Sequence, residues 1–180
     1  MIIFKDASAN KGGVTSSSLE VLAALAFTDD EFSANMQVTG GLVPQFYQEY
    51  IKAVHATIER NAQLEFECLW REHERFPEKP RSQLSDELSL AIVRLNEELQ
   101  HSSSLFDNRR LRLLVLAEAL PQLLQDRLGL EALIDERLPE NYVRACFGSY
   151  LASRFIYQYG TQPSQFSFFE FMSERYFCRL

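Results

Sequence analysis

The feature that most constrains this chain is its beginning, where a short apolar run, a polar glycine segment and a long apolar run follow one another. The run Ile2-Ile3-Phe4 contains β-favouring side chains bounded by charge and predicts a short buried strand. A polar loop is expected next, with Asn10 and the pair Gly12-Gly13 at its tip. Residues 19–27 are apolar on nearly every side and predict a buried helix. The sequence therefore predicts a strand–glycine-loop–helix corner.

A corner of this kind directs free backbone N–H groups and the positive end of a helix at one point, where phosphate or carboxylate groups bind. Residues 15–18 add four hydroxyls, and Val14 and Ser17 are expected on one helix face. The alternative is structural, since a glycine pair before a serine-rich helix start is usually a loop and an N-cap. The segment is not a phosphate loop of the lysine type, because Lys11 precedes the glycines. Spacing alone leaves both interpretations open.

The rest of the chain is predicted to be helical. Apolar positions at helical spacing predict a long helix over about residues 44–75, opened by Pro44. Residues 84–99 carry apolar positions that fit an antiparallel partner, with Ser85 as part of its cap. Pro121 predicts a kink or a restart in the apolar segment that follows. A further helix is expected over residues 139–159, with Gly160 at its C-cap. Pro163 is expected to open the last helix.

Residue types along the chain predict one solvent-exposed helix face and one further part of the core. The charged run Arg71–Arg75 indicates a solvated helix face. Near the end of the chain lies a stripe of aromatics that predicts core: Phe166, Phe168, Phe169, Phe171 and Phe177. The predicted fold class is mostly α, a helical assembly following the corner of residues 1–27, with residues 28–180 as the helical region.

Charge and cysteine usage narrow the function classes. The net charge of −7 argues against nucleic acid and anionic membranes as partners, and no apolar run approaches the length of a membrane span. Cys68, Cys146 and Cys178 are far apart and odd in number, which indicates a reducing cytoplasm. The three histidines lack metal-ligand spacing, so no metal site is predicted.

The segment Asn10-Lys11-Gly12-Gly13-Val14, followed by Ser17, resembles the Asn-x-Gly-Gly-Val…Ser segment of glutamate dehydrogenases. The longer string from Lys5 to Leu25 is similar to the large-subunit, NAD-specific branch of that family. The resemblance continues over residues 58–67, 70–73, 138–142 and 147–155, so it covers most of the chain. These later stretches are typical of the branch, without a chemistry that the residues themselves reveal.

The resemblance implies that residues 1–27 end a Rossmann-type NAD-binding domain in the C-terminal part of such an enzyme. Family members transfer a hydride from L-glutamate to NAD and release 2-oxoglutarate and ammonium. By resemblance, Asn10, Gly12 and Gly13 are cofactor-binding, while Val14 and Ser17 are substrate-binding, with Ser17 on the distal carboxylate. Lys11 departs from the alanine of many relatives.

The family's GxGxxG loop and catalytic lysine and aspartate do not occur here, so no catalytic residue is predicted in this chain. The isolated chain is therefore expected to be inactive, and its expected partners are the remainder of the subunit and further copies in a homo-oligomer. The alternative is a non-catalytic helical interaction or regulatory protein derived from the family.

Overall fold

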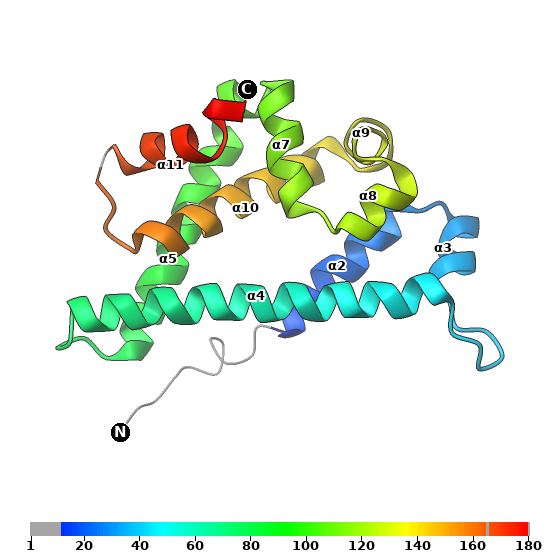
Figure 1. The fold of residues 1–180 in the computed structure, drawn as a ribbon, viewed down its shortest axis with the longest axis horizontal. Helices are drawn as coiled ribbons and strands as arrows, with labels where there is room; N and C mark the ends of the chain where they lie inside the picture. The colour runs from blue at the N-terminus through cyan, green and yellow to red at the C-terminus, as the bar shows by residue number, and fades with distance from the viewer. Residues whose placement is uncertain (1–11, 165, 180) are drawn as a thin grey trace.

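The computed structural model describes residues 12–164 and 166–179, and over these residues the fold is almost entirely helical (Figure 1). In this part of the chain the single β-type pairing is an isolated bridge between Thr39 and Leu42. The mostly helical class is thereby confirmed. Three predictions fall outside the described residues: the strand at residues 2–4, the loop residue Asn10, and Lys11. The described part of the chain contains no strand, so the strand of the predicted corner is not seen there.

Helix α4 (Gln45–Arg75) is the longest element and runs along one side of the molecule (Figure 1). Its 31 residues give a length of about 46 Å at the usual rise per residue. Pro44 precedes its first turn and Phe76 follows its last, as the sequence predicted. The other helices pack largely on one side of α4 (Figure 1).

The remaining elements follow in chain order. They are α2 (Gly12–Ala26), α3 (Asp29–Met36), α5 (Arg81–His101), α6 (Ser103–Phe106), α7 (Arg109–Ala119), α8 (Gln122–Leu128), α9 (Leu130–Ala132), the π-helix η1 (Leu133–Arg137), α10 (Glu140–Tyr159), α11 (Ser167–Arg175) and the 3₁₀ turn η2 (Phe177–Arg179). Pro121 separates α7 from α8, and Gly160 caps α10, both as predicted. Two starts were misplaced, because α5 begins after Pro80 and α11 begins well after Pro163.

Helix α10 is the centre of the core and packs against α4, α5, α7 and α11. The prediction that α5 is the antiparallel partner of α4 is wrong, because α5 packs mainly against α10 and rises steeply away from α4 (Figure 1). Gly148 permits this crossing, since a Cβ there would lie 2.7 Å from Asn96 Oδ1 on α5. The small residue lets the two backbones approach closely.

The aromatic stripe near the C-terminus is only partly core. Phe171 is buried and packs edge-on against Phe155 of α10. Phe166, Phe169 and Phe177 are exposed, which contradicts the prediction. Phe169 is exposed because α11 is a nine-residue helix that presents only one face to α10, and Phe166 and Phe177 lie beyond its two ends.

Two further observations concern the apolar character of the helices and the state of the cysteines. None of the described helices combines the length and the apolar character that crossing a bilayer requires. All three cysteines are free thiols, with Cys68 buried and Cys178 exposed.

Candidate functional site at the start of helix α2

The two glycines of the predicted site are the first residues of helix α2, and do not form the tip of a loop. Neither has a positive φ angle, so both adopt ordinary helical backbone. A Cβ at Gly12 would lie at an ordinary contact distance of 3.9 Å from Ile58 Cδ1. The first turn contains no acidic residue, so the positive end of the helix has no negative partner within that turn.

Helix α2 is buried on one face only. Leu22, Ala23 and Ala26 are buried against the core. Val14 is 78% exposed and Val21 49% exposed, and Ser17 lies between them on the same side of the helix. The prediction of a helix buried on every side is therefore wrong for this face. Among the described residues, only α4 and η1 make extensive contacts with α2.

We call this side of the helix the α2 outer face and define it by five residues. These are Val14, Ser17, Ser18, Val21 and Leu25. All five are exposed, and they follow the spacing of one helical stripe. The predicted substrate-binding pair, Val14 and Ser17, thus stands at the N-terminal end of a largely apolar, uncovered surface.

The hydroxyls of the first turn are held by the helix itself. Ser16 Oγ and Ser17 Oγ each donate to the carbonyl oxygen of Gly13, at 3.0 Å in both cases. A hydroxyl has one donor and rotates freely, so Ser17 must release Gly13 before it can donate to a carboxylate. The two serines differ in direction, because Ser16 lines a groove against α4 whereas Ser17 lies on the α2 outer face.

That groove lies between α2, α3 and α4 and has a volume of about 600 Å³. Ser16, Glu20 and His55 are polar groups on its walls. Part of its floor is the apolar stripe of α4 whose helical spacing predicted this helix: Tyr47, Ile51, Val54 and Ile58. Sequence reasoning missed the groove because helical spacing identifies an apolar face without showing how much of it the neighbouring helices cover.

Two tyrosine hydroxyls from other helices form hydrogen bonds to the backbone of α2. Tyr50 of α4 donates to the carbonyl oxygen of Leu19 at 2.6 Å, and Tyr142 of α10 donates to that of Ser18 at 3.3 Å. Burial raises the pKa of Tyr142 to about 12 and also raises that of Tyr50. Both phenols therefore stay protonated donors near neutral pH, and the start of α2 is held on a fixed support.

Metal chemistry has no support in the described part of the chain. No group of three or more histidine, cysteine, aspartate or glutamate side chains there is placed to hold a metal ion. What the start of α2 offers is a helix end, exposed backbone and hydroxyls, the groups that bind anions.

Comparison with known proteins decides the family. The model of the glutamate/leucine/phenylalanine/valine dehydrogenases matches residues 1–76. The chain is 58% identical over 97% of its length to the NAD-specific glutamate dehydrogenase of Neurospora crassa. This chain belongs to the glutamate/leucine/phenylalanine/valine dehydrogenase family. It is also 57% identical to glutamate dehydrogenase 2 of Dictyostelium discoideum and 39% identical to the NAD-specific enzyme of Saccharomyces cerevisiae, in each case over 95% of the chain.

The dehydrogenase relatives are much longer than this chain, which spans 16% of the length of each. The family model covers α2, α3 and α4, and the relatives extend the match over the later helices. No solved structure matches the chain. The resemblance stated from the sequence, to the NAD-specific branch, is confirmed.

The predicted site residues of this dehydrogenase segment are partly brought together. Gly12, Gly13, Val14 and Ser17 all lie in the first two turns of α2, with the latter two on the outer face. Asn10 lies outside the described residues. Their roles toward cofactor and substrate stay predictions.

Proposed function

We propose that this chain is the C-terminal part of an NAD-dependent glutamate dehydrogenase and that the start of α2 completes its active site. The reaction is the oxidative deamination of L-glutamate to 2-oxoglutarate and ammonium. In this proposal residues 1–27 end a Rossmann-type domain, and the helices after residue 27 brace it. NAD is the cofactor of the complete enzyme.

The observation that carries the proposal is the match of nearly the whole chain to one segment of NAD-specific enzymes. The α2 outer face supports it, because the predicted substrate residues lie on the side of the helix that the described chain leaves uncovered. The remainder of the subunit would cover this face and enclose the substrate beside it. It would also supply the GxGxxG loop and the catalytic lysine and aspartate, which this sequence does not contain.

The residue roles in this proposal are those that the family resemblance implies. Gly12 and Gly13 present backbone N–H groups at a positive helix end, where Asn10 and the nicotinamide end of NAD would lie. Val14 would line the pocket for the glutamate side chain. Ser17 would exchange its bond to Gly13 for one to the distal carboxylate of glutamate.

The test is Ser17→Ala in the intact enzyme that contains this segment. A hydrogen bond to a charged group contributes about 1.5–3 kcal/mol, so kcat/KM for glutamate should fall by about 10- to 100-fold. The KM for NAD should change little, because the hydroxyl addresses the acid. Norvaline lacks the distal carboxylate, so its poor turnover should hardly respond to the substitution.

The matched control is Ser16→Ala. Ser16 makes the same 3.0 Å bond to Gly13 but faces the groove beside α4. Its loss removes the same local bond and leaves the outer face intact. Equal effects of the two substitutions, or a loss that falls on NAD, would show that these hydroxyls only serve the helix start.

A further inference from the structure

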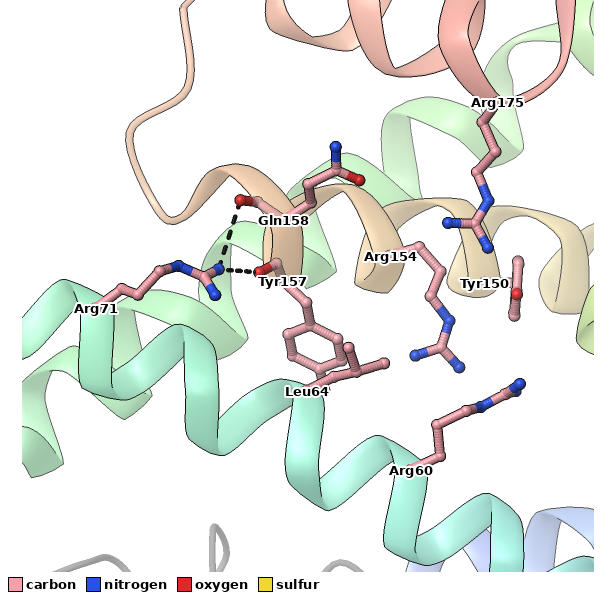
Figure 2. A pocket seen from close by; sticks show the side chains of 8 residues that line it. All are labelled: Arg60, Leu64, Arg71, Tyr150, Arg154, Tyr157, Gln158 and Arg175. Atoms are coloured by element: carbon pink, nitrogen blue, oxygen red, sulfur yellow. Dashed lines mark hydrogen bonds between the residues drawn. The ribbon is translucent and has the colours of Figure 1, made fainter.

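A second cavity, on the other side of the long helix, is lined by an unusual number of positive charges. It has a volume of about 370 Å³ and lies where α4, α10 and α11 meet (Figure 2). Six of its lining residues matter for the argument: Arg60, Arg71, Arg154, Arg175, Tyr150 and Tyr157. Among the described residues no aspartate or glutamate lines it, and it shares no lining residue with the groove beside α2. On a chain of net charge −7, this is a local cationic site.

Two of the four arginines already have partners that account for their position. Arg71 donates to the backbone carbonyls of Tyr157 and Gln158 at the C-terminal end of α10 (Figure 2). Arg175 forms an ion pair with Glu118, with 2.9 Å between Nη2 and Oε2. Both side chains are therefore held by the fold, Arg71 by backbone carbonyl oxygens and Arg175 by a carboxylate.

Arg154 is different, because it is a buried cation without a counter-ion among the described residues. It is 8% exposed, and its Nη2 donates to the neutral amide oxygen of Asn61 at 2.8 Å. Its Nη1 is buried and has no hydrogen-bond partner in the described part of the chain. The guanidinium also lies over the ring of Tyr150, 4.8 Å from the centroid. Buried charges are normally paired, so an unneutralised arginine in a cavity wall points to an absent anion.

Arg60 provides the second unpaired charge. It is exposed, lines the same cavity from α4 and forms no ion pair with any described residue. Figure 2 shows Arg60 and Arg154 extending from α4 and α10 into the same space between the helices. Glu65 is a nearby acid, but it accepts a hydrogen bond from the Tyr157 hydroxyl at 3.0 Å and does not line the cavity.

An adjoining cavity suggests the rest of the ligand. It has a volume of about 530 Å³ and shares Arg60, Tyr150 and Arg175 with the arginine cavity. Its other walls include apolar groups such as Leu120 and Pro121, together with the carboxylate of Glu118. A second phosphate there would meet Glu118, whereas an uncharged organic group fits the apolar walls.

We propose that Arg60 and Arg154 form a binding site for the phosphate group of a phosphomonoester, with its organic part in the adjoining cavity. Two unpaired guanidinium charges match a phosphate dianion, and the guanidinium fork is suited to phosphate oxygens. The two arginines belong to stretches 58–67 and 147–155, for which the sequence indicated no chemistry. The site does not depend on the role proposed for α2.

The experiment is calorimetric titration of the 180-residue chain with inorganic phosphate and with phenyl phosphate at constant ionic strength. We expect one saturable site per chain, with phenyl phosphate the tighter ligand. Arg60→Gln should weaken binding by about tenfold, because one charge-assisted contact is lost. Arg94→Gln on α5, another exposed arginine that does not line the cavity, should leave binding unchanged.

Arg154→Gln should abolish binding, and circular dichroism of the variant establishes whether it is folded. If that variant does not fold, the exposed Arg60 position still decides the question. The absence of saturable binding, or equal losses in the Arg60 and Arg94 variants, would overturn the proposal. So would benzoate binding as tightly as phenyl phosphate. The same titration on the intact enzyme must also saturate, since failure there would mean that another part of the subunit fills the cavity.

Discussion

At the residue scale, Glu72 shows how one buried acid joins two helix ends. The sequence placed it in a solvated charge run, but it is 5% exposed and therefore corrects that prediction. It accepts hydrogen bonds from the backbone N–H and the hydroxyl of Thr161, at 3.2 and 2.5 Å. Its neighbour Arg71 donates to the carbonyl of Tyr157. Adjacent residues of α4 thus bind the last carbonyls of α10 and the chain just beyond them.

Gly160 makes this arrangement possible and provides a prediction for stability. Its φ of +81° and ψ of −169° fall in a region that side chains avoid, and a Cβ there would lie 2.5 Å from Glu72 Oε1. Gly160→Ala should therefore lower the free energy of unfolding by at least about 1–3 kcal/mol from backbone strain alone. Displacement of the Glu72 carboxylate should increase the loss. Urea denaturation measures the difference.

The matched control is Gly40→Ala. Gly40 also has a positive φ, +58°, but no atom lies within 4 Å of the position its Cβ would take. Only the left-handed strain should appear there, about 1–2 kcal/mol. A loss at Gly40 as large as that at Gly160 would mean that the Glu72 contact contributes nothing.

At the element scale, helix α3 shows which features the sequence can predict. Thr28 and Glu31 form a complete capping box at its N-terminus. The same Glu31 also forms an ion pair with Arg137 of η1, with 2.7 Å between Oε2 and Nη1. The cap was predictable because its partners are three residues apart. The ion pair was not, since its partners are separated by over a hundred residues and no local pattern joins them.

The same contrast holds for the other elements and for the candidate site. Pro44, Pro121 and Gly160 marked helix ends correctly, because they act through their own backbone. The packing of α5 on α10 depends on Gly148 meeting Asn96, a contact that sequence spacing does not reveal. Likewise, the candidate residues at the start of α2 were identified from the sequence, although the glycines were expected in a loop, whereas the arginine cavity required α4 and α10 to be placed side by side.

The ion pair between Glu31 of α3 and Arg137 of η1 predicts that the stability of the protein depends on pH. The hydrogen bond from Arg137, aided by the one from the Thr28 backbone, lowers the pKa of Glu31 from 4.5 to about 2. A carboxyl with a depressed folded-state pKa adds stability that is complete above its unfolded pKa and is lost as the pH falls through the folded pKa. The contribution of Glu31 should therefore disappear between about pH 4.5 and 2.

Arg137→Gln tests the contribution of this ion pair. The variant should be less stable than the wild type at pH 7, and the difference in thermal midpoint should shrink as the pH falls from 4.5 toward 2. Arg94→Gln, which removes an arginine without a carboxylate partner among the described residues, should show no such convergence. A midpoint difference for Arg137→Gln that is constant from pH 7 to 2 would contradict the assignment.

At the scale of the whole molecule, the described chain has a complete core and two surfaces that lack complementary groups. The core is continuous, from Leu22 of α2 through Leu69 of α4 to Phe171 of α11. The α2 outer face is apolar and uncovered, and the arginine cavity is cationic and unpaired. Both surfaces fit the proposal that this chain, which spans 16% of the length of its Neurospora crassa relative, contributes to a larger assembly.

The last prediction concerns the isolated chain, in which the described residues leave the α2 outer face uncovered. An exposed apolar stripe drives association, so the chain should form dimers or bind an apolar dye through this face. Val21→Ser should weaken the dimer by about tenfold or more, because burying a valine side chain contributes about 1.5 kcal/mol or more. Sedimentation at several concentrations measures the change.

The control is Val93→Ser on α5. Val93 is 50% exposed, almost the same as Val21 at 49%, and its substitution should leave the dimer unchanged. A strictly monomeric chain that binds no dye, or equal losses in the two variants, would mean that the outer face of α2 is not the surface that the rest of the enzyme covers.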